Sequence, residues 1–230
     1  INTAGRPLCK PALEWNNAYK LERERELVGL YLSAHPLDPY YMELNYGCMT
    51  IANFEKAEKT DGMKVAIGGL VVDFQKRDTR RGGKMGIMKL EDYTGTYEVK
   101  FFDDDYYKYV NFGEPGTPVF VEMTFSESRY RPGEIRSSIN SIDLLSKLKG
   151  RLLKGITIEL DTGSISNTMI DLLVDKANKP GDNLGSLTFE LYDGSLNRTI
   201  KLDSALRIPL TRDLAEMLDD MNLSYRFENN

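Results

Sequence analysis

The sequence predicts a mixed fold, in which a small β-barrel of five strands lies between a helical segment and a small α+β unit. Three observations predict it. The first part of the 230-residue chain is rich in helix-forming residues, the middle alternates apolar and polar residues, and the last part alternates strand and helix patterns. We therefore divide the chain into residues 1–61, 62–150 and 151–230, which suits a length of one large or two small domains.

Residues 1–61 are expected to form a helical lead-in to the barrel. The stretch from Trp15 to Leu32 contains many helix formers and no proline. The chain then reaches His35-Pro36-Leu37-Asp38-Pro39, where the residue before each proline is pushed out of the α region, so the helix must end. A further helical turn is expected from Tyr40 to Leu44.

Residues 62–150 contain five stretches with the period of a β-strand. They are Val65 to Phe74, Met85 to Leu90, Tyr97 to Phe101, Val119 to Phe125 and Ile135 to Ser141. Acidic residues begin a helical stretch, Asp103 to Phe112, between the third and fourth of them. Three strands, a helix and two strands is the order of the OB fold, a five-stranded and partly open barrel.

The first of these strands contains a change of phase. Val65 and Ile67 alternate with small or polar neighbours, and after Gly68-Gly69 the apolar positions are Leu70, Val72 and Phe74. Such a slip at a glycine pair is typical of a β-bulge, which lets a strand bend around a barrel. We therefore predict a bulge at the glycine pair.

Residues 151–230 alternate strand and helix patterns in a β-α-β-β-α-β order. The predicted elements are a strand over Ile156 to Leu160, a helix from a Ser166 cap to Asn178, a hairpin of Leu187 to Leu191 with Thr199 to Leu202, a helix opened by Thr211, and a strand over Tyr225 to Phe227. We interpret this order as the split βαβ arrangement.

The bulk composition limits the class of protein. Taken over the whole chain, the net charge of −5 argues against a nucleic-acid binder, because phosphate contacts need local Lys and Arg. Residues 62–150 are the exception, with 14 basic and 13 acidic side chains, against 9 and 13 in residues 151–230. Two cysteines make no disulfide framework, and we see neither a signal peptide nor a membrane-spanning run, so we expect a cytoplasmic protein.

Basic residues gather in two connections of the predicted barrel. Lys76, Arg77, Arg80, Arg81 and Lys84 surround Gly82-Gly83 between the first two strands, opposed only by Asp78, and Arg129, Tyr130 and Arg131 lie between the last two. These two connections flank the binding face of an OB barrel. Cations that follow phosphates, together with rings that stack on bases, are what a single strand of DNA requires. The alternative is a pair of solvated basic loops.

Three further residues complete the predicted nucleic-acid interface. Phe74 and Phe125 end strands next to the basic loops, where each either stacks on a base or belongs to the core. Lys100 lies on the face opposite Val99 and Phe101, which places it on the outer surface. The predicted interface comprises Phe74, Lys76, Arg77, Arg80, Arg81, Lys84, Lys100, Phe125, Arg129, Tyr130 and Arg131.

No catalytic centre, metal site or cofactor site is predicted, and we do not expect an enzyme activity in this chain. Asp103-Asp104-Asp105 invites a metal interpretation, but neighbours on a helix do not face one another, and a helix start explains their charge. His35 is the only histidine and lacks a positioned partner. The acidic helix from Thr211 to Met221 either docks a partner protein or covers the sheet of its own domain.

One stretch is similar to a known family. Glu26 to Tyr40, which reads ELVGLYLSAHPLDPY, resembles the segment that precedes the OB domain in the alpha subunit of bacterial DNA polymerase III, a family that usually has glycine where this chain has Ala34. The resemblance covers Glu22 to Leu148 and continues through Gly68-Gly69-Leu70-Val71, Leu90-Glu91-Asp92, Gly95 and Glu98-Val99 to Phe102.

The resemblance implies that this is the C-terminal part of a replicative polymerase subunit whose full chain is a DNA-directed nucleotidyltransferase. The catalytic carboxylates of the family lie upstream and are absent here. The OB domain would guide the unpaired template strand. The last domain would dock other holoenzyme subunits, in some members the tau subunit of the clamp loader. The sliding-clamp motif of the family is not seen between Ile1 and Leu21.

Two alternatives remain open beside a fragment that binds single-stranded DNA and docks a partner. The first is a protein-interaction module with little DNA affinity of its own. The second is an OB module of the RNA type, such as an anticodon-binding domain, which would use 2′-hydroxyl contacts. The motif from Leu27 to Leu37 argues against the RNA type.

Overall fold

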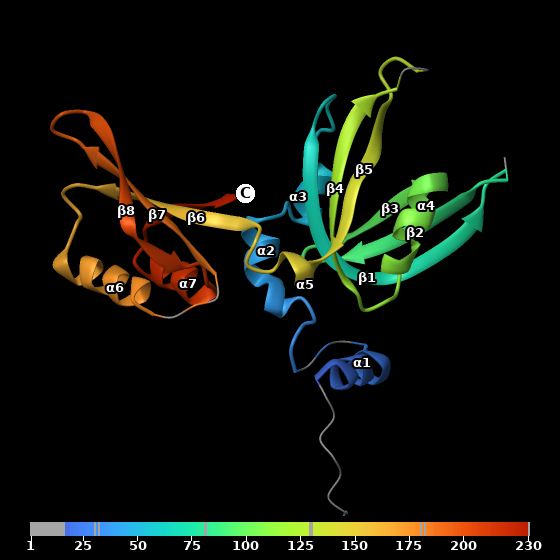
Figure 1. The fold of residues 1–230 in the computed structure, drawn as a ribbon, viewed down its shortest axis with the longest axis horizontal. Coiled ribbons are helices and arrows are strands. Elements are labelled where there is room, and N and C mark those ends of the chain that lie inside the picture. The colour runs from blue at the N-terminus through green and yellow to red at the C-terminus, as the bar shows by residue number, and fades with distance from the viewer. Residues whose placement is uncertain are drawn as a thin grey trace, which may run out of the picture.

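The computed structural model describes residues 17–29, 31, 33–80, 82–128, 131–179, 181 and 183–229. In Figure 1 the β-barrel lies to one side and the unit of residues 151–230 to the other, with part of the lead-in segment between them. Among the described residues, no helix has both the length and the apolar character needed to cross a membrane.

The lead-in segment contains more helices than its sequence pattern predicts. Its elements are α1 (Asn17–Val28), the 3-10 turn η1 (Asp38–Tyr40), α2 (Tyr41–Tyr46) and α3 (Ile51–Lys56). α1 ends before the predicted Leu32, because the chain turns at Gly29 with φ +80°. α3 was not predicted. Its first backbone N–H, on Ile51, donates to the Asp92 carboxylate at 2.8 Å, a partner 41 residues away that no local pattern reveals.

The barrel has the predicted OB architecture. Its strands are β1 (Lys64–Asp78), β2 (Lys84–Glu91), β3 (Thr96–Phe102), β4 (Pro118–Glu127) and β5 (Ile135–Leu144), with α4 (Asp103–Tyr109) and η2 (Val110–Phe112) after β3, and α5 (Leu145–Leu148) after β5. The sheet order is β3-β2-β1-β4-β5. Near α4, the Tyr109 hydroxyl donates to the Asn140 carbonyl of the edge strand β5 at 3.2 Å.

The bulge in β1 lies beyond the glycine pair, so its predicted position is wrong. The pairing of β1 with β4 runs unbroken from Lys64 to Leu70, and the shift falls between Val71 and Asp73 in the pairing with β2. Val71, not Val72, therefore packs in the barrel core. The glycines permit close packing instead. A Cβ on Gly69 would lie 2.9 Å from the backbone oxygen of Glu91.

The last unit has the predicted order of elements but a different sheet. Its elements are β6 (Leu153–Asp161), α6 (Asn167–Ala177), β7 (Leu184–Asp193), β8 (Arg198–Pro209), α7 (Arg212–Asp220) and β9 (Ser224–Asn229). The order is β8-β7-β6-β9, and β6 pairs directly with β7 in parallel. The split arrangement is therefore wrong: the β7–β8 hairpin places β8 at the outer edge, and no strand lies between β6 and β7. α6 and α7 share one core beneath the sheet.

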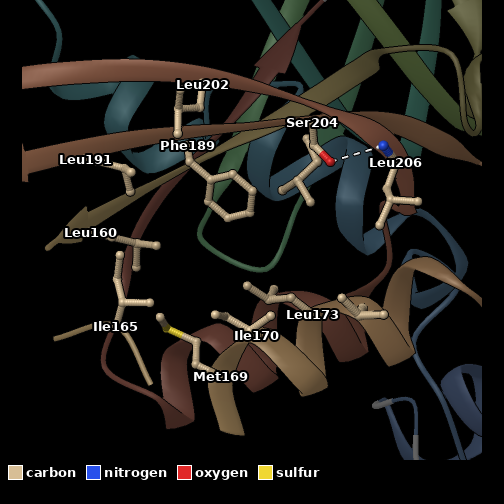
Figure 2. A pocket seen from close by; sticks show the side chains of 12 residues that line it. Leu160, Ile165, Met169, Ile170, Leu173, Phe189, Leu191, Leu202, Ser204 and Leu206 are labelled. Atoms are coloured by element: carbon tan, nitrogen blue, oxygen red, sulfur yellow. Dashed lines mark hydrogen bonds between the residues drawn. The ribbon is translucent and has the colours of Figure 1, made fainter. Parts of the chain in front are cut away.

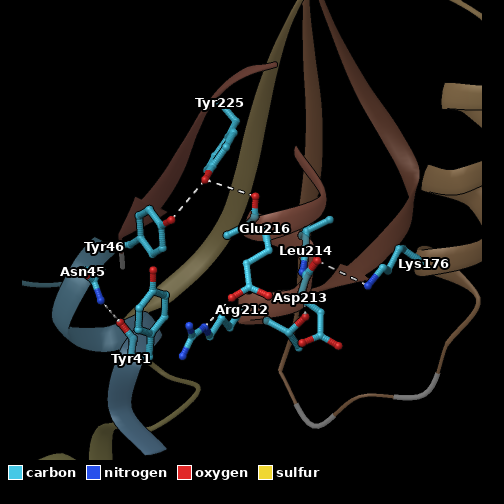
Figure 3. A network of polar contacts seen from close by, with 11 residues as sticks. Tyr41, Asn45, Tyr46, Lys176, Arg212, Asp213, Leu214, Glu216 and Tyr225 are labelled. Atoms are coloured by element: carbon cyan, nitrogen blue, oxygen red, sulfur yellow. Dashed lines mark hydrogen bonds and ion pairs between the residues drawn. The ribbon is translucent and has the colours of Figure 1, made fainter. Parts of the chain in front are cut away.

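The lead-in segment contributes side chains to both units. Met42 packs in the core of residues 151–230, whereas Leu44 packs with Leu70 on the outside of the barrel. Figure 3 shows the polar part of this junction, where the Tyr46 and Tyr225 hydroxyls lie 3.2 Å apart. α2 thus contacts the strands on either side of it.

The turn around His35 is tied to the β2–β3 connection. The Asp38 carboxylate accepts from the Tyr93 hydroxyl at 2.6 Å and from the His35 backbone N–H at 2.7 Å, and the His35 ring packs 4.7 Å from that of Tyr93. Partial burial alone would raise the pKa of Asp38, but these two hydrogen bonds, together with the charges of His35 and Arg212, outweigh it and hold the pKa below its usual value.

We predict that Gly69→Ala destabilises the protein by about 1–3 kcal/mol, because the new methyl group meets the backbone of Glu91, which cannot move without shifting β2. Denaturant unfolding followed by circular dichroism measures this. Gly95→Ala is the matched control, since a Cβ there makes only ordinary contact with Ile51 at 3.5 Å. Equal stability of the two variants would contradict the close packing.

We also predict a pH-dependent effect of Asp38→Asn. A carboxyl with a lowered folded-state pKa stabilises the fold above its unfolded value of about 3.9, and that stabilisation is lost as the pH falls through the folded pKa. The variant should therefore melt below the parent at pH 7, and the difference in Tm should shrink in acid. Asp104→Asn serves as a control. A difference that does not change with pH would refute the role of the charge.

Candidate nucleic-acid interface

The surface of β1, β2 and β3 that points away from the core carries a cross-strand row of Asp73, Lys89 and Glu98 and, nearer the β1–β2 hairpin, two further rows of side chains. The strand register places Arg77 opposite Met85 and Met85 opposite Phe102. It likewise aligns Gln75, Ile87 and Lys100. Successive residues of a strand point to opposite faces, so the burial of Val99 and Phe101 puts Lys100 and Phe102 outside. We call these two rows the outer face.

Phe102 is the feature of the outer face that the predicted interface lacks. Phe102 is 49% exposed, although a phenylalanine in a strand usually packs inward. The sequence does contain a signal for it. Phe102 follows Glu98 and Lys100 at the outward positions of the strand, where a face that contacts only water would be expected to carry a polar residue.

The basic side chains differ in how far neighbouring carboxylates neutralise them. Lys84 forms an ion pair with Asp78, and the Lys100 Nζ lies 3.5 Å from the Glu98 Oε2. Arg77 donates to the Gln75 side chain and, within the part of the chain that the structure describes, forms no ion pair. Arg77 is therefore the cation of the outer face that is best placed to meet a phosphate.

The β1–β2 hairpin continues this surface. It is closed by backbone hydrogen bonds from Thr79 to the Gly83 carbonyl at 2.8 Å and from Gly82 to the Thr79 carbonyl at 3.0 Å. Arg80 extends from it and lines an open pocket together with Phe102. Lys76, predicted as part of the interface, lies 5.9 Å from the ring centroid of Phe74. Arg81 lies outside the described residues.

The two phenylalanines predicted either to stack on bases or to join the core take the second role. Phe125 is 5% exposed and packs in the barrel core beside Phe54. Phe74 is half-buried, and its ring stacks on Phe101 with 5.9 Å between centroids. Both rings lie on the faces of β1 and β4 that point into the barrel, so we no longer place Phe74 and Phe125 at the interface.

The second basic connection, between β4 and β5, is separate from the first. Figure 1 shows the tips of the β1–β2 and β4–β5 hairpins well apart. Arg131 is exposed but lies 3.4 Å from Glu134, which also pairs with Arg136. Arg129 and Tyr130 lie outside the described residues. The structure therefore assembles the outer face around the first connection only.

A second surface feature lies in residues 151–230. An apolar groove of about 260 Å³ runs between α6 and the underside of β7 and β8. Figure 2 shows Ile170 and Leu173 of α6 facing Leu202 and Leu206 of β8 across it. Helix α7, by contrast, buries Leu214 and Leu218 completely, so it covers its own sheet and leaves no free apolar stripe of its own at these positions.

The remaining reactive side chains do not gather. Within the described ranges, no three His, Cys, Asp or Glu residues are grouped as a metal site requires. Asp103, Asp104 and Asp105 form the first turn of α4, as predicted. Burial raises the pKa of the Cys48 thiol to about 12, which keeps it protonated and unreactive at neutral pH.

The chain is similar in sequence to known proteins. A family model described as tRNA_anti-codon, an OB-fold nucleic acid binding domain, matches residues 65–145. A DNA polymerase III subunit alpha from Pasteurella multocida is 28% identical over 156 residues, which is 68% of this chain and 13% of that protein. One from Mycobacterium tuberculosis is 27% identical over 214 residues, or 90% of this chain and 18% of that protein.

Among solved structures, the mitochondrial single-stranded DNA binding protein Rim1 of S. cerevisiae aligns with a TM-score of 0.28 and 17% identity over 37% of this chain and 97% of its own. The chain spans between about an eighth and a fifth of the length of the two alpha subunits described above. Over most of its own length the chain is similar to proteins named DNA polymerase III subunit alpha, and residues 65–145 match an OB-fold nucleic acid binding domain.

Proposed function

We propose that the outer face of the barrel binds single-stranded DNA. The observation that carries the proposal is the exposed ring of Phe102 in the same cross-strand row as Arg77, next to the row of Lys100. Rings supply stacking platforms for bases, at about 1–3 kcal/mol per base, and cations follow the backbone. A flat row with both groups suits an unpaired strand laid across β1, β2 and β3.

The exposed ring favours a single strand over a duplex. The flat faces of bases inside a duplex are already covered by their neighbours, so Phe102 would find no base to stack on. A duplex would meet only the cations of the outer face, and these are few. We therefore expect a preference for unpaired DNA rather than tight binding of any nucleic acid.

The charges of the outer face imply moderate affinity that falls with salt. The chain carries a net charge of −5, and its barrel segment is close to neutral. The contact of Lys100 with Glu98 is an exposed ion pair, which contributes little and can be exchanged for a phosphate. Binding by a few cations depends on the release of counterions, so the affinity should weaken steeply as salt is added.

The names of the related proteins support DNA as the ligand. The matching family model is described as nucleic acid binding, and the related proteins are named DNA polymerase III subunit alpha. We propose that the full-length protein is a DNA-directed DNA polymerase, that the polymerisation chemistry belongs to its other regions, and that this barrel holds the template strand near them. The affinity of the barrel for DNA, not catalysis, is then the property to test.

We predict that the double variant Arg77→Gln, Lys100→Gln binds a labelled ~20-nucleotide oligo-dT more weakly than the parent. Each phosphate contact removed should lower the slope of log affinity against log salt by about 0.7. Fluorescence anisotropy at several salt concentrations measures both quantities.

The matched control removes the same charge from the other unit, with Lys154→Gln and Lys201→Gln, two exposed lysines of residues 151–230. It should keep the affinity and the slope of the parent. An equal loss in both variants would show a general electrostatic effect and would remove the assignment to the outer face.

A second candidate function is protein docking by residues 151–230. We infer that the apolar groove between α6 and β8 takes an amphipathic helix with basic flanks from another holoenzyme subunit. The groove supplies the apolar contact, and the 13 acidic against 9 basic residues of this unit supply charge complementarity. This role is compatible with DNA binding by the barrel.

For this second function we predict that Leu202→Asp, which puts a charge into the groove, abolishes binding to a purified clamp-loader tau subunit in surface plasmon resonance. The control is Leu196→Asp, because Leu196 is an exposed apolar residue that does not line the groove. Full binding by the Leu202 variant would exclude the groove, and oligo-dT binding should be unchanged in both variants.

A further inference from the structure

The pocket at the tip of the β1–β2 hairpin combines three kinds of side chain. It is lined by Thr79, Arg80, Gly82, Gly83, Phe102 and Asp103. We call it the hairpin pocket. It offers an aromatic ring, a guanidinium group and a carboxylate within one open hollow of about 640 Å³.

The Asp103 carboxylate is placed in this pocket by an unusual backbone. Asp103 has φ +47°, in the left-handed region that residues other than glycine seldom adopt. Such conformations persist where the surroundings impose them, and they gather at functional sites. Gly83, on the opposite side of the pocket, leaves room for this carboxylate, since a Cβ on Gly83 would overlap the Asp103 Oδ1.

The Asp103 oxygens are available to a ligand. Across the described part of the chain, the Asp103 carboxylate makes no hydrogen bond or ion pair. The nearby Thr79 hydroxyl is already engaged, because it accepts from the Gly83 N–H at 3.0 Å. A carboxylate is an acceptor only, so a ligand beside it has to present hydrogen-bond donors, and on a DNA base these are N–H groups.

We infer that the hairpin pocket holds one unpaired base of the bound strand and prefers guanine. This inference rests on the proposed function. The base would stack on the Phe102 ring, as any base can. Its Watson–Crick edge would face Asp103, and of the four bases only guanine presents two adjacent donors, N1–H and the 2-amino group, to a carboxylate. Arg80 is then placed to meet the neighbouring phosphate.

The other bases fit Asp103 less well. Adenine and cytosine each present one amino group beside a ring-nitrogen acceptor. Thymine presents a single N–H between two carbonyl oxygens, which the carboxylate repels. The predicted order is therefore guanine first and thymine last, with stacking on Phe102 common to all four bases.

The test compares two labelled 20-nucleotide strands, oligo-dT and the same strand with three central guanines, by fluorescence anisotropy with the 230-residue chain. The parent should bind the guanine strand about fivefold to a hundredfold more tightly, the range of a bidentate base contact. Asp103→Asn should lose this preference, because the amide ends both the attraction for the two guanine donors and the repulsion of the thymine oxygens, so that the affinities for the two strands converge. Phe102→Leu, which keeps an apolar side chain, should weaken both strands.

The control is Asp104→Asn, which removes the same charge from the exposed residue that follows Asp103 and does not line the pocket. It should keep the preference for guanine. Equal affinities of the parent for the two strands, or a preference that survives Asp103→Asn, would overturn the guanine site while leaving the proposed function standing. No binding of either strand at low salt would overturn both.

Discussion

The rest of the barrel depends on the way β1 is shared by two partners. Its first half pairs with β4 up to Leu70, and its second half pairs with β2 from Leu70 to Asp78. A strand can change partners like this only if it bends, and neighbouring chains come very close at the bend. Gly68 and Gly69 meet that demand, because side chains there would collide with Leu44 and with the backbone of Glu91.

The bend and the bulge together determine which side chains of β1 lie on the outer face. The bulge after Val71 adds one residue to β1, so Phe74 points inward and Gln75 and Arg77 point outward. Without that extra residue, the alternation would turn Arg77 inward and remove it from the row of Met85 and Phe102. The arrangement on which we base DNA binding is therefore a consequence of one irregular residue in one strand.

The lead-in segment makes the two folded units depend on one another. Met42 and Leu44, two residues apart, pack in separate apolar clusters, and the buried Glu43 between them accepts from the Gly150 N–H at 2.8 Å, where the barrel ends and β6 approaches. Helix α2 is too short to be stable alone, so these contacts hold it in place. Single-stranded DNA bound to the barrel and a protein bound in the groove would thus occupy two units that are joined through one short helix.

The sequence by itself determined the local elements, because strand alternation and helix caps depend on residues close in the chain. The five barrel strands, the order of elements in residues 151–230 and the caps at Ser166 and Thr211 all belong to this class. The tertiary structure alone decided which strands are neighbours, where the bulge lies, and that Phe125 is buried while Phe102 is exposed. These properties depend on contacts between residues far apart in the chain. The start of α3 needs Asp92, which is 41 residues away. β6 pairs with β7 on one side and with β9 on the other, and Asp103 meets Gly83 only after the chain has folded back.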